Sequence, residues 1–269
     1  MIIHNLDPVL VDFGLFQIRW YSLAYIFGII LSWIYINIII KKITKEKYSF
    51  ISIKSPQFDD LLTYLILGII FGGRLGYVLF YNFEYFSQNL LEIFKIWQGG
   101  MSFHGGLFGV IVSTLIYSKI TKNNFFRFTD LICCAAPIGI FLGRIANFIN
   151  GELYGKFSTL PWSVIFPDSG NIPRHPSQIY ESILEGIILF ILINFLAFKK
   201  KSLNTTGLTS GIFLVLYSTF RIISEIFREP DSHLGYFLNY FSMGTLLSLI
   251  TLFSGFLIIF FIKKDEKNN

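Results

Sequence analysis

The sequence predicts an all-α integral membrane protein with about seven transmembrane helices. Of its 269 residues, 53% are hydrophobic and 14% are charged, and the mean hydropathy is +0.60. Soluble globular domains carry about 25% charged residues. Apolar stretches also recur at lengths near the ~20 residues that a helix needs to cross a bilayer. We therefore expect one polytopic membrane domain over residues 1–269.

Seven apolar stretches are candidates for these helices. They cover about residues 20–40, 61–81, 104–120, 128–148, 179–198, 208–227 and 240–262. The third is the shortest, and the fourth has the most polar end. The first residues lack the basic region of a cleaved signal peptide, so we expect the first stretch to remain as a span.

Lysines and arginines in the connections predict the orientation. One side carries fourteen of them: Lys41, Lys42, Lys45, Lys47, Lys54, Lys119, Lys122, Arg127, Lys199, Lys200, Lys201, Lys263, Lys264 and Lys267. The other side carries five: Arg19, Lys95, Lys156, Arg174 and Arg228. By the positive-inside rule the C-terminus is cytoplasmic and the N-terminus faces outward, into the periplasm. Residues 150–177 are expected to form a small periplasmic cap, of which the part 157–175 contains Pro161, Pro167 and Pro173.

The fourth span ends in an unusually polar segment, Gly143-Arg-Ile-Ala-Asn-Phe-Ile-Asn-Gly-Glu-Leu-Tyr-Gly155. An arginine in hydrocarbon costs about 2.5–3.5 kcal/mol on insertion scales, so such groups usually face a polar cavity or a partner. Arg144 and Asn147 are three residues apart and share a helix face. A guanidinium matches the oxygens of a phosphate, which favours an anion site here. The alternative is a structural pair or a side chain that reaches the interface.

A second polar stripe runs along the sixth span. Tyr217, Arg221, Glu225 and Arg228 recur every three or four residues and so lie on one face. A glutamate and an arginine on one face can also form a structural ion pair of low net benefit. The tyrosine on the same face favours a site.

Two basic residues lie among glycines near the outward ends of other spans. His104 opens the third span and is a candidate acid, base or donor, although a histidine there can also be an interfacial residue. Glycines beside it allow a neighbouring helix or a lipid headgroup to approach closely. Arg74 either binds a headgroup or is structural, and the sequence does not separate these roles.

The start of the fifth span has a complete explanation without function. Ser177 is a candidate helix cap, and Glu181 lies in the first turns, where the helix dipole favours a negative charge. Tyr180 and Glu181 are also candidates to line the same cavity as Arg144.

Several chemistries lack the motifs they need. Metal-ligand spacing, phosphate-binding glycine loops after strands and the GxSxG elbow are missing from the sequence. The adjacent Cys133 and Cys134 are read as small buried hydrophobes. We expect no cofactor, no metal and no nucleic-acid partner. Cations, amides and tyrosines around an outward cavity favour an anionic phospholipid. A lipid or anion transporter is the alternative, but internal repeats and helices broken in both halves, which such proteins typically show, are not visible.

The motifs resemble those of bacterial prolipoprotein diacylglyceryl transferases, in order from about Leu6 to Gly244. Beside the segment 143–155, the matching stretches are Arg19-Trp-Tyr-Ser-Leu-Ala-Tyr25, Gly72-Gly-Arg-Leu-Gly-Tyr-Val-Leu-Phe-Tyr-Asn82, His104-Gly-Gly-Leu-Phe-Gly-Val110, Arg174-His-Pro-Ser-Gln-Ile-Tyr-Glu181 and the stripe from Tyr217 to Asp231. Two departures are Ala146, where the family commonly has glycine, and a short cap between Phe157 and Arg174.

The resemblance implies a seven-span enzyme of the bacterial inner membrane whose active site faces the outer leaflet. Such an enzyme transfers the diacylglyceryl group of phosphatidylglycerol to the lipobox cysteine of preprolipoprotein signal peptides, forming a thioether and releasing glycerol phosphate. Its partners are these two substrates and membrane lipids. Carried onto this chain, Arg144 binds the phosphate and Arg221 supports the leaving group or the acceptor. The implied site also includes His104, Tyr21, Asn147, Glu152, Gly155, Tyr217 and Glu225.

The predicted residues suit that reaction. A thiol attacks a glycerol carbon while negative charge gathers on the departing phosphate, which fixed cations stabilise. The thiol becomes a better nucleophile by losing its proton. His104 is our candidate base, and another group or the leaving phosphate itself are the alternatives.

Overall fold

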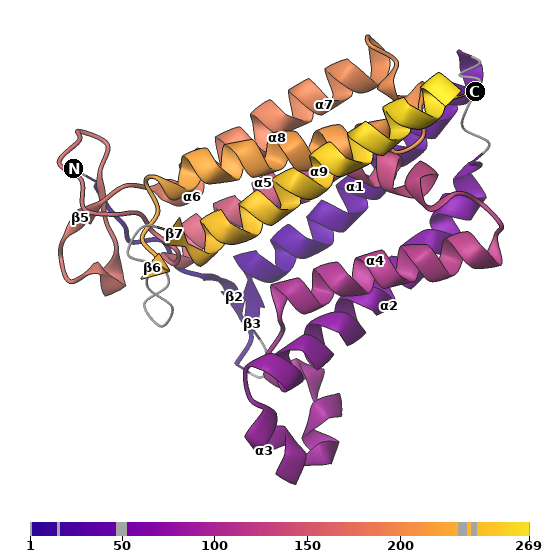
Figure 1. Cartoon of the computed structure of the whole chain (residues 1–269). Helices are drawn as coiled ribbons and strands as arrows, with labels where there is room; N and C mark the ends of the chain where they lie inside the picture. Colours follow the sequence, from indigo (N-terminus) through magenta and orange to yellow (C-terminus); the bar gives the residue numbers. More distant parts are fainter. Residues whose placement is uncertain (1, 15–16, 47–52, 231–235, 238–240, 269) are drawn as a thin grey trace. The chain divides into compact units, whose positions relative to one another are not determined.

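A computed structural model describes residues 2–14, 17–46, 53–230, 236–237 and 241–268 (Figure 1). The chain forms two compact units. The first consists of Met1–Ile39, Lys47–Phe50 and Asp130–Asn269, and the second of Ile40–Glu46 and Ile51–Thr129. Each unit is described by itself below.

Six helical stretches have the length and composition to cross a membrane, which confirms the predicted all-α, multi-pass fold class. They are α1 (Trp20–Lys45), α2 (Ser55–Phe80), α4 (Phe103–Ile120), α5 (Phe125–Asn150), the continuous stretch Ser177–Phe198, and Met243–Lys264 within α9 (Met243–Asn268). The stretch Ser177–Phe198 consists of α6 (Ser177–Glu181), the π-helix η4 (Ser182–Ile188) and α7 (Leu189–Phe198). The seventh expected span forms α8 (Leu208–Glu225), which is not among the six and carries Arg221 and Glu225.

Several predicted helix starts differ from the structure by a few residues, and the start of α2 differs most. Helix α2 begins at Ser55, six residues before the predicted 61. Pro56 is at its first turn, where a missing N–H costs nothing, and the backbone N–H of Lys54 donates to Gln57 Oε1 at 2.9 Å. Hydropathy alone missed this polar first turn. Helix α9 begins at Met243, and Tyr240, the predicted start of the last span, lies outside the described residues.

In the second unit, α2 and α4 lie side by side and are joined by a row of glycines (Figure 1). A Cβ atom built on Gly109 would lie 1.9 Å from the carbonyl oxygen of Gly68. One built on Gly105 would lie 2.3 Å from the carbonyl oxygen of Gly72. The two backbones therefore touch, which is how small residues bring helices together where hydrophobic association is weak.

Arg74 is a structural residue of this unit. Its side chain is buried and contacts five carbonyl oxygens: Ile93 at 2.8 Å, Gly99 at 2.6 Å, Gly100 at 3.2 Å, Glu92 at 2.6 Å and Lys95 at 3.4 Å. The connection after α2 contains α3 (Phe83–Gln88), η1 (Leu90–Phe94) and η2 (Ile96–Gln98), and the five carbonyls lie in η1, directly after η1 and directly after η2. The guanidinium carries five N–H donors. Arg74 thus fixes the fold of this connection, which decides between the two roles left open by the sequence.

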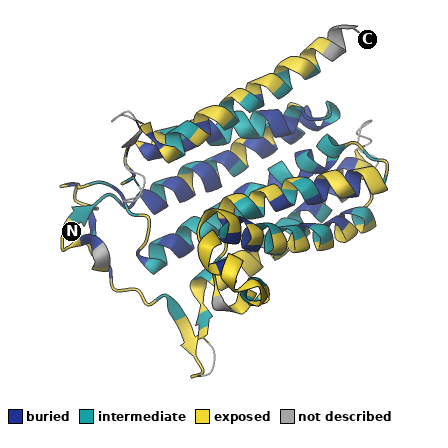
Figure 2. Ribbon diagram, turned by 60° about the horizontal axis from the view of Figure 1, so that its bottom comes forward, coloured by how far each residue is buried: buried dark blue, intermediate teal, exposed yellow. Residues whose placement is uncertain are grey.

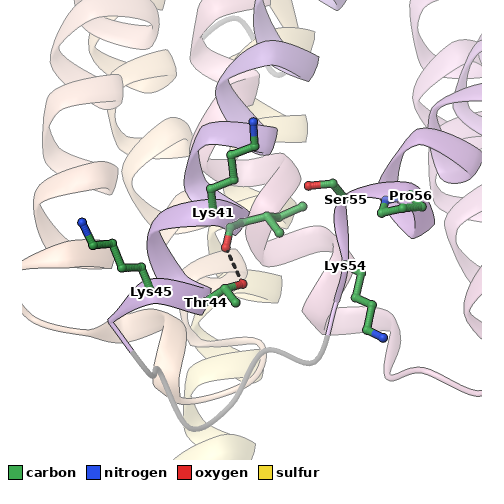
Figure 3. A pocket seen from close by; sticks show the side chains of 7 residues that line it. Lys41, Thr44, Lys45, Lys54, Ser55 and Pro56 are labelled. Atoms are coloured by element: carbon green, nitrogen blue, oxygen red, sulfur yellow. Dashed lines mark hydrogen bonds between the residues drawn. The ribbon is translucent and has the colours of Figure 1, made fainter.

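The same unit contains a cavity of about 560 Å³ between the end of α1 and the start of α2 (Figure 3). Its lining residues are Ile40, Lys41, Thr44, Lys45, Lys54, Ser55 and Pro56. The three lysine side chains point apart in Figure 3, so their ammonium groups do not converge on one position.

In the first unit, the stretch Ser177–Phe198 is the most enclosed span. Within its most apolar part 44% of residues are buried, against 11% for Met243–Lys264. Helix α9, which ends at the C-terminus marked in Figure 2, is exposed along much of its length. Charged side chains on α6 and η4 are therefore held inside the unit rather than at its lipid-facing surface.

A buried carboxylate fixes the start of α8 against α5. Asp130 accepts hydrogen bonds at 2.7 Å from the backbone N–H groups of Gly207 and Ser210, and also from the Ser210 hydroxyl at 2.7 Å. Gly207 adopts a left-handed conformation, with φ of 88°, immediately before the helix. The negative charge meets the unpaired N–H groups and the positive end of the helix dipole. Asp130 thus sets the position of the helix that carries Arg221.

Short strands gather at the other end of this unit. β1 (Ile2–Ile3) pairs in parallel with β4 (Val164–Ile165), which pairs antiparallel with β5 (Pro173–Arg174). β2 (Val9–Asp12) and β3 (Gln17–Arg19) form a hairpin, as do β6 (Tyr236–Phe237) and β7 (Phe241–Ser242). Residues 150–177 therefore contain β4, the short helix η3 (Pro167–Ser169) and β5. One further short helix, η5 (Ser202–Asn204), precedes α8.

Replacing Arg74 with lysine should destabilise the segment from Phe83 to Gln98. A lysine has three donors and cannot reach all five carbonyls, and each lost hydrogen bond to a charged group is worth about 1.5–3 kcal/mol. We expect a lower thermal unfolding temperature in detergent and faster proteolysis within this segment. The exposed Arg19→Lys is the control and should change neither quantity. Unchanged proteolysis of Arg74→Lys would contradict this structural role.

Candidate active site

The first unit buries a cluster of three arginines and three glutamates. The members come from α5, α6, η4, α8 and the residues after α8, and they are Arg144, Glu181, Glu185, Arg221, Glu225 and Arg228. The predicted Arg144, Arg221 and Glu225 thus meet in one place, as the sequence patterns indicated.

Glu181 contacts all three arginines. Its Oε2 lies 2.8 Å from Arg144 Nη1, and its Oε1 lies 2.9 Å from Arg221 Nη1 and 3.4 Å from Arg228 Nη1. Oε2 accepts no hydrogen bond within the described part of the chain, so its contact with Arg144 is an ion pair without hydrogen-bond geometry. The side chain is 0% exposed. A carboxylate at this depth is stable only with such partners.

Glu185 contacts two of the same arginines at longer range. Its Oε2 lies 3.3 Å from Arg144 Nη2, and its Oε1 lies 3.5 Å from Arg221 Nη1. The residue is in the π-helix η4, a rare conformation that is frequent at functional sites. A Cβ on the next residue, Gly186, would lie 2.7 Å from the Cβ of Phe141 on α5. The missing side chain lets η4 approach α5 one turn before Arg144.

Glu225 closes the cluster on the side of α9. It pairs with Arg221, lies 3.7 Å from Arg228 Nε and accepts a hydrogen bond from the Ser242 hydroxyl at 2.6 Å. A Cβ on Gly244 would lie 2.5 Å from Glu225 Oε1. The start of α9 therefore leaves room for the Glu225 carboxylate only because residue 244 is a glycine.

The two predicted arginines differ in what they can still bind. Arg221 is 10% exposed and contacts three carboxylates, those of Glu181, Glu185 and Glu225. Arg144 is 18% exposed and contacts only Glu181 and Glu185, through Nη1 and Nη2. Its Nε donates to no acceptor among the described residues. Arg144 is therefore the better placed of the two to bind an additional anion.

A polar turn follows Arg144 on the same chain segment. Asn147 Nδ2 donates to Glu152 Oε1 at 2.7 Å, and Asn150 Nδ2 donates to the same oxygen at 3.4 Å. Gln178 Nε2, at the start of α6, donates to the backbone oxygen of Glu152 at 2.6 Å. Gly151, with φ of 70°, allows the chain to reverse here. Asn147 and Glu152, predicted together, thus contact each other, and the Glu152 side chain is exposed.

Gly155 lies at a crowded junction. Its N–H donates to His175 O at 2.8 Å, and it forms a β-bridge with Arg228. A Cβ there would lie 2.5 Å from Phe227 O and 2.6 Å from the Cβ of His175. The structure thus gives this glycine a packing reason: it lets the cap join the backbone that follows α8.

The predicted tyrosines lie beside the cluster rather than in its ion pairs. Tyr217 stacks on Phe213, with ring centroids 5.9 Å apart, and interacts electrostatically with the Arg144 and Glu185 charges. The Tyr21 hydroxyl lies 3.4 Å from that of Tyr25, which in turn interacts electrostatically with Arg144 and Glu152.

His104 belongs to the second unit, near the start of α4. Its side chain is exposed and its ring meets Phe103 edge to face at 5.6 Å. Ser102 Oγ caps the helix by accepting from the Gly105 N–H at 3.2 Å. His104 is thus available for a partner, and its role as a base stays a prediction.

Sequence reasoning did not single out Glu185, and it explained Glu181 as a helix-start residue that was also a candidate to line the cavity. A usable signal was present: two carboxylates four residues apart inside an apolar span are as costly as an arginine there. Their shared face required partners of opposite charge, and the arginines at 144 and 221 were the available ones.

The fold and this cluster define a multi-pass α-helical membrane protein with buried arginines, one of which retains donors for an anion. The chain belongs to the prolipoprotein diacylglyceryl transferase family, whose sequence pattern matches residues 8–261. The phosphatidylglycerol–prolipoprotein diacylglyceryl transferase of Rickettsia canadensis is 47% identical over 255 residues, which cover 95% of this chain and 96% of the relative. That of Rickettsia typhi is 48% identical over 259 residues, covering 96% and 98%.

A methyl group on Gly244 should displace Glu225. Gly244→Ala places a carbon where the carboxylate lies, and such overpacking typically costs about 1–3 kcal/mol. Gly139→Ala on α5 is the matched control, because a Cβ there meets nothing within 4 Å and alanine favours a helix. Thermal unfolding in detergent should show a lower midpoint for Gly244→Ala alone. Equal midpoints would show that α9 does not confine Glu225.

Proposed function

We propose that this chain transfers the diacylglyceryl group of phosphatidylglycerol to the lipobox cysteine thiol of preprolipoproteins, the first step of lipoprotein maturation. The products are a thioether-linked lipid on the protein and glycerol phosphate. Family membership and the names of the relatives support the reaction. The single structural observation that carries it is Arg144, a partly buried arginine beside two carboxylates whose Nε remains available as a donor.

The location we propose is the bacterial inner membrane, with the cluster facing the outer leaflet. The cluster gathers the C-terminal ends of α5 and α8 and the starts of α6 and α9. Lysines at the other ends of these helices favour a cytoplasmic side by the positive-inside rule. The headgroup of an outer-leaflet phospholipid and an extracytoplasmic signal peptide would both reach such a site.

In the proposed reaction the cysteine sulfur attacks the glycerol carbon that bears the phosphate ester. The S–C bond forms, the C–O bond breaks, and its electron pair goes to the phosphate oxygen. Arg144 binds the phosphate and stabilises the charge that develops on it, as preorganised cations do. Arg221 is held in place by three carboxylates. We propose that its positive charge adds to that of Arg144 in stabilising the leaving group. His104 is the proposed acceptor of the thiol proton.

The remaining predicted residues receive supporting roles. Asn147 and Glu152 hold the turn after Arg144, and we propose that they bind the headgroup hydroxyls together with Tyr21 and Tyr217. Glu225 anchors Arg221. Gly155 permits the cap to pack against the backbone that follows α8.

Transfer to a lipobox peptide tests the function. Purified protein in micelles that contain phosphatidylglycerol should add the mass of a diacylglyceryl group to the peptide cysteine. Arg144→Ala should lower kcat/KM by about 10²–10³-fold, the effect of removing one charge-stabilising donor. Arg19→Ala, on an exposed strand, is the matched arginine control and should retain activity. Lack of transfer by the unmodified protein would overturn the proposal, and activity of Arg144→Ala would remove Arg144 from the site.

His104→Gln tests the proton acceptor separately. A residue that deprotonates the thiol contributes typically 10²–10⁴-fold, and its loss should change the pH dependence of kcat/KM. Glutamine keeps a similar size, and the exposed position should tolerate it. Turnover close to the unmodified protein across the pH range would exclude His104 as the base and favour the leaving phosphate.

A further inference from the structure

We infer that Glu181 and Glu185 are positioning residues that set the spacing of Arg144 and Arg221 for the phosphate. This inference rests on the proposed function. It gives Glu181, which the sequence suggested as a helix-start residue or a cavity-lining residue, and Glu185, which the sequence analysis did not single out, a defined part in substrate binding.

Each of the two carboxylates bridges Arg144 and Arg221, with one of its oxygens on each arginine. Glu181 has Oε2 on Arg144 and Oε1 on Arg221, at 2.8 and 2.9 Å. Glu185 repeats this pattern at 3.3 and 3.5 Å. Two rigid bridges of this kind fix both the distance between the guanidinium groups and the orientation of their planes. A site for a tetrahedral anion needs this control, because a displacement of about 1 Å can cost 10²-fold in rate.

The carboxylates lie on the interior side of the arginines. Glu181 and Glu185 are both 0% exposed, whereas the side chains of Arg144 and Arg221 are 18% and 10% exposed. An anion that arrives from outside therefore meets the exposed edge of Arg144 first and finds the glutamates behind it. With this arrangement, Glu181 and Glu185 hold the arginines in place and do not compete with the phosphate for the position in front of Arg144.

The backbone enforces the arrangement through two close approaches. Gly186 lets η4 touch α5 at Phe141, three residues before Arg144 on the same helix. Glu185 is the neighbour of that glycine, so the contact between the two helices also sets how far Glu185 is from Arg144. The Asp130 cap fixes α8, and with it Arg221, from the other end.

Neutralising each glutamate by amide substitution tests the inference. Glu181→Gln and Glu185→Gln should raise the KM for phosphatidylglycerol at least tenfold and lower kcat/KM accordingly, because a neutral amide no longer orients two cations. Glu92→Gln is the matched control, because the Glu92 carboxylate pairs with Lys95 and contacts no arginine of the cluster. We expect the KM for phosphatidylglycerol to stay unchanged in Glu92→Gln.

The direction of the change in KM separates the two possible roles. If the glutamates compete with the phosphate, their neutralisation lowers the KM, and the inference is overturned. Unchanged KM and kcat in both glutamine variants would also overturn it. The unmodified protein serves as the reference, since absence of transfer there refutes the proposed function rather than this inference.

Two milder variants keep the test informative if an unpaired arginine prevents folding. Glu185→Asp retains the charge and retracts the carboxylate by one methylene. Gly186→Ala pushes η4 from α5 and leaves every charged group in place. Each should raise the KM for phosphatidylglycerol about tenfold in protein that still unfolds cooperatively. An unchanged KM in both folded variants would show that the spacing of the arginines does not depend on these contacts.

Discussion

Mutual neutralisation of three arginines and three glutamates is the constraint on which the first unit depends. None of these groups is stable alone inside a membrane protein, because the cost of removing an ion from water exceeds what one imperfect partner returns. Together they need α5, α6, η4 and α8 at fixed distances, so the helices are held by the same contacts that hold the charges. The same ion pairs therefore determine both the stability of the first unit and the geometry of the site.

Close packing within each unit depends on glycines. In the first unit, Gly186 and Gly244 make room for Phe141 and Glu225. In the second unit, glycines on α2 and α4 bring these two helices together without intervening side chains. In lipid, such backbone contact replaces the hydrophobic association available in water. Gly186 and Gly244 therefore help to determine where Glu185 and Glu225 lie.

Hydropathy was enough to predict the class of fold, because the need to satisfy backbone groups in a bilayer leaves few alternatives. The cost of charge in that setting also singled out Arg144 and the stripe with Arg221 and Glu225 as candidate sites, and the family resemblance put them in one site. Helix starts were less accessible: the first turn of α2 is polar and is stabilised by Pro56 and Gln57, which hydropathy does not register. The role of Glu185 and the hydrogen-bond acceptors of Arg74 could not be predicted from the sequence for a different reason. The partners of both residues are distant in sequence, and only folding brings them within reach.

The crowded junction at Gly155, where the cap meets the backbone that follows α8, has a consequence for the evolution of the cap. Lys156 bonds to His175 and Phe227 through its backbone, so the chain between Phe157 and Arg174 leaves and returns at one closed point. The entropy of closing a loop rises only slowly with its length. Residues can therefore be added to or removed from the outer part of the cap without moving Arg228 or the cluster behind it. A short cap is thus a matter of local architecture, and relatives are free to elaborate this surface independently of their chemistry.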